Sequence, residues 1–208
     1  MIVQIVAAGG TMVIGVLLFL SFFMFLDPDH GLFFGKRDIF MICLGSVVAA
    51  AVWAWTTAEM EPMMRVVWLL IHILFLSCSM TDHQTYQVYD ISQYVGVCLT
   101  GYLVFQSAVF IWHGVSVLLF VLLQYFIFMR LYGKADGMIF LTAALAETSL
   151  GGDICTYLFH MILSYLLLSV VQGVRGNIRR KGKLARPVAF LPYITVSFWV
   201  VLLMKDLM

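Results

Sequence analysis

Two aspartates lie where apolar stretches of the chain meet short polar segments. Asp82 is in the segment Thr-Asp-His-Gln-Thr at residues 81–85, and Asp136 is in Gly-Lys-Ala-Asp-Gly at residues 133–137. Two carboxyl groups held close together in a poorly solvated place cannot both ionise easily, so the charged one can activate a water while the protonated one polarises a carbonyl. This is the chemistry of aspartic proteases. The simpler interpretation is that each aspartate caps a helix N-terminus by accepting backbone N–H bonds.

The composition predicts which kind of structure must position these aspartates. The chain has 208 residues, of which 63% are hydrophobic and 11% charged, whereas soluble domains have roughly 45–50% and about 25%. These values indicate a multi-pass membrane protein with a single integral-membrane domain over residues 1–208. Residues 1–26 are nearly continuously apolar and show no pattern typical of a cleaved signal peptide, so we expect them to form the first helix.

A hydropathy scan with about 20 residues per span predicts an all-α bundle of about eight transmembrane helices. Charged or Gly- and Pro-containing segments separate them. The predicted spans are residues 3–26, 39–58, 64–80, 93–111, 114–131, 137–151, 154–173 and 188–205.

Basic residues predict how these spans are oriented. The segment 173–186 contains six of the twelve Lys and Arg residues, and basic loops are retained on the cytoplasmic side. Alternation through eight spans then places ten basic residues inside, two outside and both termini outside. We therefore expect a protein of the inner (plasma) membrane whose two aspartates face the cytoplasm. Orientation in the bilayer explains the charge asymmetry better than binding of nucleic acid or anionic lipid.

Three short segments, in this order, resemble the type IV prepilin peptidase family of GxGD-type membrane aspartyl proteases. In that family the first catalytic aspartate precedes a stretch that usually ends in Ile-Pro-Asn, the second closes a Gly-x-Gly-Asp motif, and a Pro-Phe-x-Pro-like segment opens the last span. The matching segments here are residues 82–90, residues 133–145, and Arg-Pro-Val-Ala-Phe-Leu-Pro-Tyr-Ile at residues 186–194. The resemblance covers roughly residues 35–205.

The resemblance implies an aspartyl endopeptidase that cleaves the leader peptide of prepilin-like (pilin or pseudopilin) proteins at the cytoplasmic membrane face. Asp82 and Asp136 would be the catalytic pair, and neither a cofactor nor a metal is implied. The small residues Gly133, Ala135 and Gly137 either let the substrate backbone approach or permit a sharp turn into the sixth span. Lys134 either attracts a carboxylate or lipid phosphate, or extends to the membrane interface.

The chain departs from the family pattern at several positions. Ala135 replaces the second glycine of the motif, Met138 stands where a lysine is common, and Tyr89 and Asp90 stand where Pro-Asn is usual. An inactive, peptidase-like membrane scaffold is therefore one alternative. Residues 27–38 contain no cysteine, so the N-methyltransferase activity associated with the cysteine-rich loop of longer family members is not carried over.

Asp90 offers a second candidate for the first catalytic aspartate, because a Tyr-Asp pair followed by Gly-x-x-Asp is similar to presenilin-type proteases. The spacing favours Asp82. Val88 lies six residues after Asp82, as the family's isoleucine does after its catalytic aspartate, and this puts Asp90 at the position of the family's asparagine.

The remaining polar residues fit other roles. Glu147 would lie about 16 Å along a helix from Asp136 at 1.5 Å per residue, too far to join the pair, although a proton- or cation-coupled transporter could use such intramembrane acids. The histidines lack metal-ligand spacing, so no metal site is predicted. The cysteines show no CxxC spacing and are interpreted as packing residues. The histidines are His30, His72, His83, His113 and His160.

Overall fold

The computed structural model describes residues 2–27, 32, 34–107, 115–123, 126, 133–178 and 188–204. All regular secondary structure in these ranges is helical, which confirms the predicted all-α class. Residues 115–123 form one helical segment. The other helices are α1 (Ile2–Leu26), α2 (Lys36–Thr56), α3 (Pro62–Thr85), α4 (Asp90–Gln106), α6 (Lys134–Ser149), α7 (Ile154–Ile178) and α8 (Leu191–Met204).

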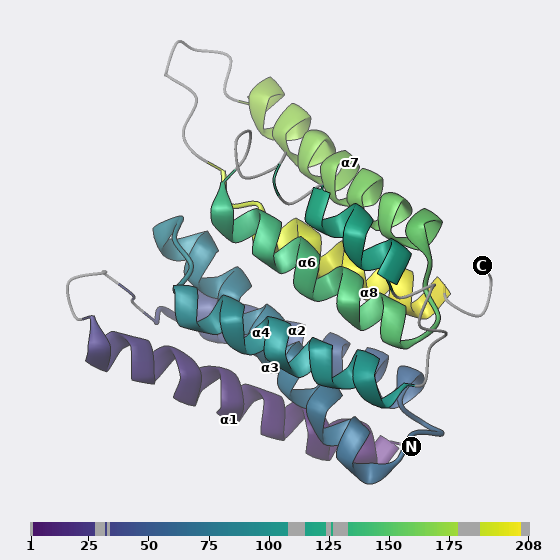
Figure 1. The fold of residues 1–208 in the computed structure, drawn as a ribbon. Coiled ribbons are helices and arrows are strands. Elements are labelled where there is room, and N and C mark those ends of the chain that lie inside the picture. Colours follow the sequence, from purple (N-terminus) through teal and green to yellow (C-terminus); the bar gives the residue numbers. More distant parts are fainter. Residues whose placement is uncertain are drawn as a thin grey trace.

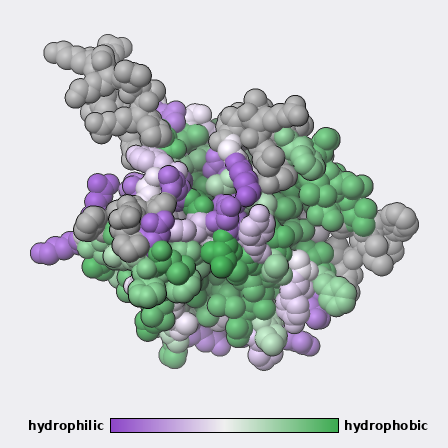
Figure 2. Space-filling view, turned by 60° about the vertical axis from the view of Figure 1, so that its left-hand side comes forward, coloured by the Kyte–Doolittle hydropathy of each residue, from purple (hydrophilic) through white to green (hydrophobic). Residues whose placement is uncertain are grey.

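Four of the helices are long and apolar enough to cross a membrane. They are α1, α2, α3 and the part of α7 from Ile154 to Val174. Figure 2 shows hydrophobic residues over most of the visible body of the molecule, with hydrophilic residues gathered toward the upper part of the view. The chain is therefore a membrane protein, while the choice of membrane and the orientation in it stay predictions.

Helices α3 and α8 form the centre of the bundle (Figure 1). α3 packs against α1, α2, α4 and α8, and α8 packs in addition against α2, α6 and α7. In the most apolar stretch of α3 67% of the residues are buried, against 28% in α1 and 22% in α7. Stacked rings join the two central helices, with the centroids of Phe75 and Phe198 4.7 Å apart. In a bilayer such packing, rather than escape from water, holds helices together.

Close packing of α4 on α6 aligns the beginnings of these two helices. Gly96 of α4 faces Thr142 of α6 so closely that a Cβ atom on Gly96 would lie 3.1 Å from the Thr142 side chain. Because glycine has no side chain, the two helices approach there without a clash. At the same end of the pair, Lys134 of α6 reaches Asp90 of α4.

The structure corrects the predicted end of the third span. α3 continues to Thr85, five residues beyond the predicted end at residue 80, so Asp82 lies in the last turns of a helix and not in a loop. The polar residues at 81–85 lower the hydropathy but are compatible with helical hydrogen bonding. The helix ends at Tyr86, which has a left-handed φ of 57° and donates its N–H to the Asp82 carbonyl.

Part of the predicted topology lies outside the residues that the structure describes. The side chains that carry most of the charge asymmetry, Arg130, Lys205 and the six of the segment 173–186, are among them, as is His113. Within the described part, Arg65 lies in the first turn of α3, the end predicted to face outside, and its guanidinium donates to the carbonyls of Ala58 and Met60. The predicted inside and outside ends therefore correspond to opposite ends of α3.

Candidate active site

The candidate site lies at the end of the bundle where α3 ends and α4, α6 and α8 begin. Asp82 is in the last turns of α3, Asp90 is the first residue of α4, and Asp136 is in the first turn of α6. Leu191 is the first residue of α8. The structure thus brings both predicted catalytic residues, and residues 188–194 of the third matching segment, to one end of the molecule.

Asp82 is buried and bound to the N-terminus of α8. Its side chain is 8% exposed, and its Oδ2 atom accepts a hydrogen bond from the Leu191 N–H at 2.9 Å. The backbone amide of Phe190 adds a second interaction of the same kind. Burial disfavours the ionised form of this carboxyl group, and the positive end of the helix and these amides oppose that effect. Asp82 does act as a helix cap, as the simpler interpretation proposed, but for a helix that begins 109 residues later.

Asp136 has a different environment. It is half-buried, and it precedes the apolar part of α6. Burial, and then the negative charge of Asp82, raise the pKa of the Asp136 carboxyl from 3.8 to about 7. The two carboxyl groups are therefore close enough to interact electrostatically, although the two aspartates are more than 50 residues apart in the sequence.

The small residues around Asp136 have distinct structural roles. Gly133 has φ 133° and ψ 154°, a conformation that side-chain-bearing residues rarely adopt. It forms the sharp turn into α6. Ala135 and Gly137 are in the first turn of α6 and have no positive φ, so alanine is accommodated at position 135 where the family motif has glycine.

Asp90 and Lys134 form an ion pair at the rim of the site. The Lys134 Nζ and Asp90 Oδ2 atoms are 3.1 Å apart, with the two side chains 47% and 63% exposed. The ammonium also lies 5.7 Å from the centre of the Tyr94 ring. Of the two predicted roles for Lys134, the structure shows attraction of a carboxylate, and it is the carboxylate of Asp90.

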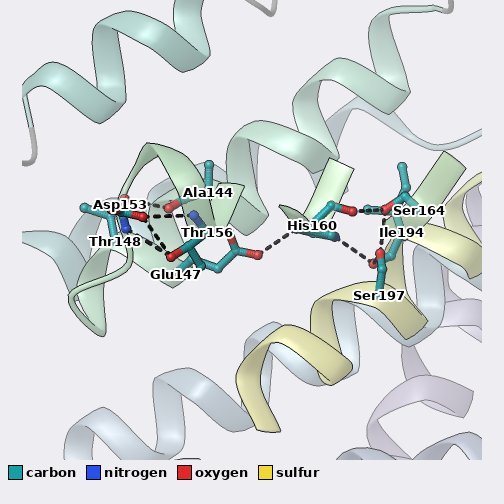
Figure 3. Close-up of polar contacts among 9 residues, drawn as sticks. All are labelled: Ala144, Glu147, Thr148, Asp153, Thr156, His160, Ser164, Ile194 and Ser197. Carbon is teal, nitrogen blue, oxygen red and sulfur yellow. Dashed lines mark hydrogen bonds and ion pairs between the residues drawn. The ribbon is translucent and has the colours of Figure 1, made fainter. Parts of the chain in front are cut away.

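A second pair of ionisable residues lies deeper in the bundle, and the sequence analysis did not find it. His160 Nδ1 of α7 and Glu147 Oε1 of α6 are 2.6 Å apart, and the two side chains are 0% and 3% exposed. The His160 Nε2 atom lies 3.1 Å from the carbonyl oxygen of Ile194 in α8 (Figure 3). A signal for it was present, because polar residues within apolar spans need partners inside the protein. The sequence does not show that α6 and α7 are rotated so that Glu147 and His160 face each other.

Two other histidines, His72 and His83, lie in the ranges that the structure describes. His72 of α3 is buried and accepts a hydrogen bond from Trp199 Nε1 at 3.2 Å on its Nδ1 atom, which ties α3 to α8. His83 is exposed beside Asp82. In the described ranges, no group of three or more His, Cys, Asp or Glu residues is placed to hold a metal ion.

The geometry suits acid–base chemistry on a polar substrate. One carboxyl group accepts hydrogen bonds from backbone amides, and burial and the charge of that group raise the pKa of the other to about 7, so the two do not ionise together easily at pH values around 7. Comparisons with models of protein families, with curated proteins and with solved structures find no match to this chain.

Proposed function

We propose that this protein is a membrane-embedded aspartyl endopeptidase that removes the leader peptide of prepilin-like proteins at the cytoplasmic membrane face. The observation that carries the proposal is the electrostatic coupling of Asp82 and Asp136 at one end of the bundle. The resemblance of residues 82–90, 133–145 and 186–194 to type IV prepilin peptidases supports the substrate class.

The proposed mechanism assigns a different role to each carboxyl group. Asp82, ionised, takes a proton from a water molecule, whose oxygen forms a bond to the carbon of the scissile peptide carbonyl. Asp136, protonated, gives its proton to the carbonyl oxygen, so the tetrahedral intermediate carries no charge there. When the intermediate collapses, the C–N bond breaks, the proton on Asp82 passes to the leaving nitrogen, and Asp136 takes back its proton.

The position of the pair suggests how a substrate reaches it. Both carboxyl groups lie at the end of the bundle where α3 ends and α6 begins, and many large apolar side chains are exposed on the outer surface of the helices. A prepilin-like protein has a polar leader joined to an apolar helix. In the proposed complex the apolar helix lies in the bilayer against this bundle, and the extended leader passes the two carboxyl groups.

The test is cleavage of a co-expressed prepilin-like protein, followed by mass spectrometry of the product. Asp82→Asn and Asp136→Asn should each lower the rate at least ~10²-fold, the usual contribution of one acid–base group. Asp38→Asn is the matched control, because Asp38 lies in the first turn of α2, is partly exposed and accepts the Gly35 amide at 3.0 Å, which asparagine can also do. Unchanged processing by Asp136→Asn would reject the proposal.

A further variant separates Asp82 from Asp90 as the partner of Asp136. Asp90→Asn should keep most of the activity, because Asp90 contacts Lys134 at the exposed rim. If Asp90→Asn abolished cleavage and Asp82→Asn spared it, the assignment of the pair would be wrong.

A further inference from the structure

The buried pair of Glu147 and His160 belongs to a chain of polar contacts that joins α6, α7 and α8. Figure 3 shows Glu147 pointing toward His160 and His160 pointing toward Ile194. Two serines continue the contacts between α7 and α8, with the Ser164 hydroxyl bonded to that of Ser197. The Ser197 hydroxyl in turn donates to the Ile194 carbonyl at 2.9 Å.

Hydrogen-bond accounting fixes the protons of this pair. A carbonyl oxygen only accepts, so the His160 Nε2 atom that contacts the Ile194 carbonyl must carry a hydrogen. The Nδ1 atom lies 2.6 Å from a carboxyl oxygen, and two lone pairs would repel at that distance, so a second proton lies between them. Whichever atom holds it, the pair carries no net charge, which is the state that burial favours.

This contact lies about one helical turn from Leu191, whose amide binds Asp82. Ile194 follows Leu191 by three residues, or about 4.5 Å along the helix at 1.5 Å per residue. On the other side of α8, Thr195 is hydrogen-bonded to Ser79 of α3, with the two hydroxyl oxygens 2.6 Å apart. The first turn of α8 is thus held by α7 and by α3, and its first amide binds Asp82.

We propose that Glu147 and His160 are positioning residues for the catalytic pair: they hold α8 where the Leu191 amide meets the Asp82 carboxylate. This inference rests on the proposed function for its catalytic consequence. Apolar side chains could fill the same space at no cost in stability. A hydrogen bond to one particular carbonyl does what apolar contact does not, because its directionality fixes the position of α8 along its own axis.

The first test compares variants that keep or remove the hydrogen bond to His160. In Glu147→Gln the side-chain amide can donate a hydrogen to His160 Nδ1 and leave Nε2–H facing Ile194, so this variant should retain the wild-type pH profile of cleavage. Glu147→Leu should move the acidic limb, which reports protonation of the ionised aspartate, to higher pH by roughly one unit. A purely structural role would lower the amount of folded protein and leave that limb in place.

The second test removes the amide that the pair is proposed to place. Leu191→Pro lacks the N–H donor but suits the first position of a helix, so it should produce the same shift of the acidic limb, while Leu191→Ala should not. Combined with Glu147→Leu, Leu191→Pro should add no further shift, because both changes remove one interaction. Independent, additive shifts would overturn the proposal.

A third measurement does not depend on cleavage. In a chain with its native cysteines replaced, the combined variant Ser79→Cys and Thr195→Cys should form a disulfide rapidly. Adding Glu147→Leu should slow the formation of this disulfide several-fold, whereas adding Glu147→Gln should not change its rate. If the wild-type protein cleaves no prepilin-like substrate but the cysteine-pair variants show these cross-linking rates, the proposed function fails and the positioning of α8 stands. Equal cross-linking in all three backgrounds would overturn the positioning role. Should Glu147→Leu fail to fold, the double variant Glu147→Leu with His160→Leu replaces it, since both polar groups are then removed.

Discussion

Among the ionisable pairs in the described part of the molecule, the pair of Asp82 and Asp136 and the pair of Glu147 and His160 differ in charge, in position and in burial. Asp82 and Asp136 carry charge of the same sign, lie at a polar end of the bundle and are coupled across α3 and α6. Glu147 and His160 carry opposite charge or none, and they are almost completely buried among α6, α7 and α8. The two carboxyl groups of the first pair repel each other when both are charged, whereas the carboxyl group and imidazole of the second pair stabilise each other. Chemical reactivity is therefore expected of the first pair, and fixed helix positions of the second.

Helix α6 supplies one acidic residue to each pair, so the helix on which an acid lies does not determine whether it is reactive or structural. Asp136 is in the first turn of the helix and Glu147 is in its last turns. Asp136 meets another carboxyl group, and Glu147 meets an imidazole. The same carboxyl chemistry serves two purposes because the partner differs.

The largest expected difference between the two pairs is in their contribution to the free energy of unfolding. His160→Leu should lower the free energy of unfolding by about 3–5 kcal/mol, because it leaves Glu147 buried without a partner. Changing both residues to leucine should recover most of that loss. Asp136→Asn should cost little, since it removes a carboxyl group that burial already disfavours. Denaturation in mixed detergent micelles measures these values, and an equal loss in both pairs would contradict the division of roles.

The next effect concerns pH. Burial and the charge of Asp82 both disfavour the charged form of Asp136, so its pKa rises to about 7 and the protonated acid predominates below that pH. The cleavage rate should therefore fall as the pH rises above about 7, by about tenfold per unit. Rates measured on the same substrate from pH 5 to pH 9 test this. A rate that stays constant to pH 9 would show that Asp136 does not act as the acid.

A smaller effect is expected where α4 packs on α6. Gly96→Ala would place a Cβ atom 3.1 Å from the Thr142 side chain and 3.3 Å from Leu74 Cδ2, and it should cost about 1–3 kcal/mol. Gly101 of α4 is the matched control, because no atom lies within 4 Å of its Cβ position. Gly101→Ala should leave stability unchanged or raise it. If both variants behaved alike, helix propensity and not close packing would explain the result.

The smallest effect is expected at the exposed ion pair of Lys134 and Asp90. Lys134→Met, Asp90→Asn and the double variant form a cycle whose coupling energy should be close to zero, because the two side chains are 47% and 63% exposed. Cleavage should also change little. A large loss of activity in Lys134→Met alone would indicate that this lysine contacts the substrate.

Hydropathy predicted most of the fold because apolar spans of helical length have few alternatives in a bilayer. The predicted spans 3–26, 137–151 and 154–173 begin and end within about five residues of the ends of α1, α6 and α7. The error at the end of α3 has a local cause. Hydropathy falls at Thr81, but nothing between Thr81 and Thr85 interrupts helical hydrogen bonding until Tyr86 adopts a left-handed conformation.

The candidate site was predictable only in part. The motif around Asp136 and the spacing from Asp82 to Val88 identified the two aspartates, and a count of spans placed them on one face. The bond from Leu191 to Asp82, and the meeting of Glu147 with His160, depend on how helices far apart in sequence rotate toward each other. Residue types on single helices do not contain that information.

The bond between the Leu191 amide and Asp82 has a consequence for biosynthesis. The acceptor is made 109 residues before its donor, so a growing chain inserts three helices and more before the group that steadies Asp82 has been synthesised. In the proposed peptidase, the catalytic pair is therefore complete only after α8 has been synthesised. Partly made chains would then be harmless to the membrane proteins inserting beside them.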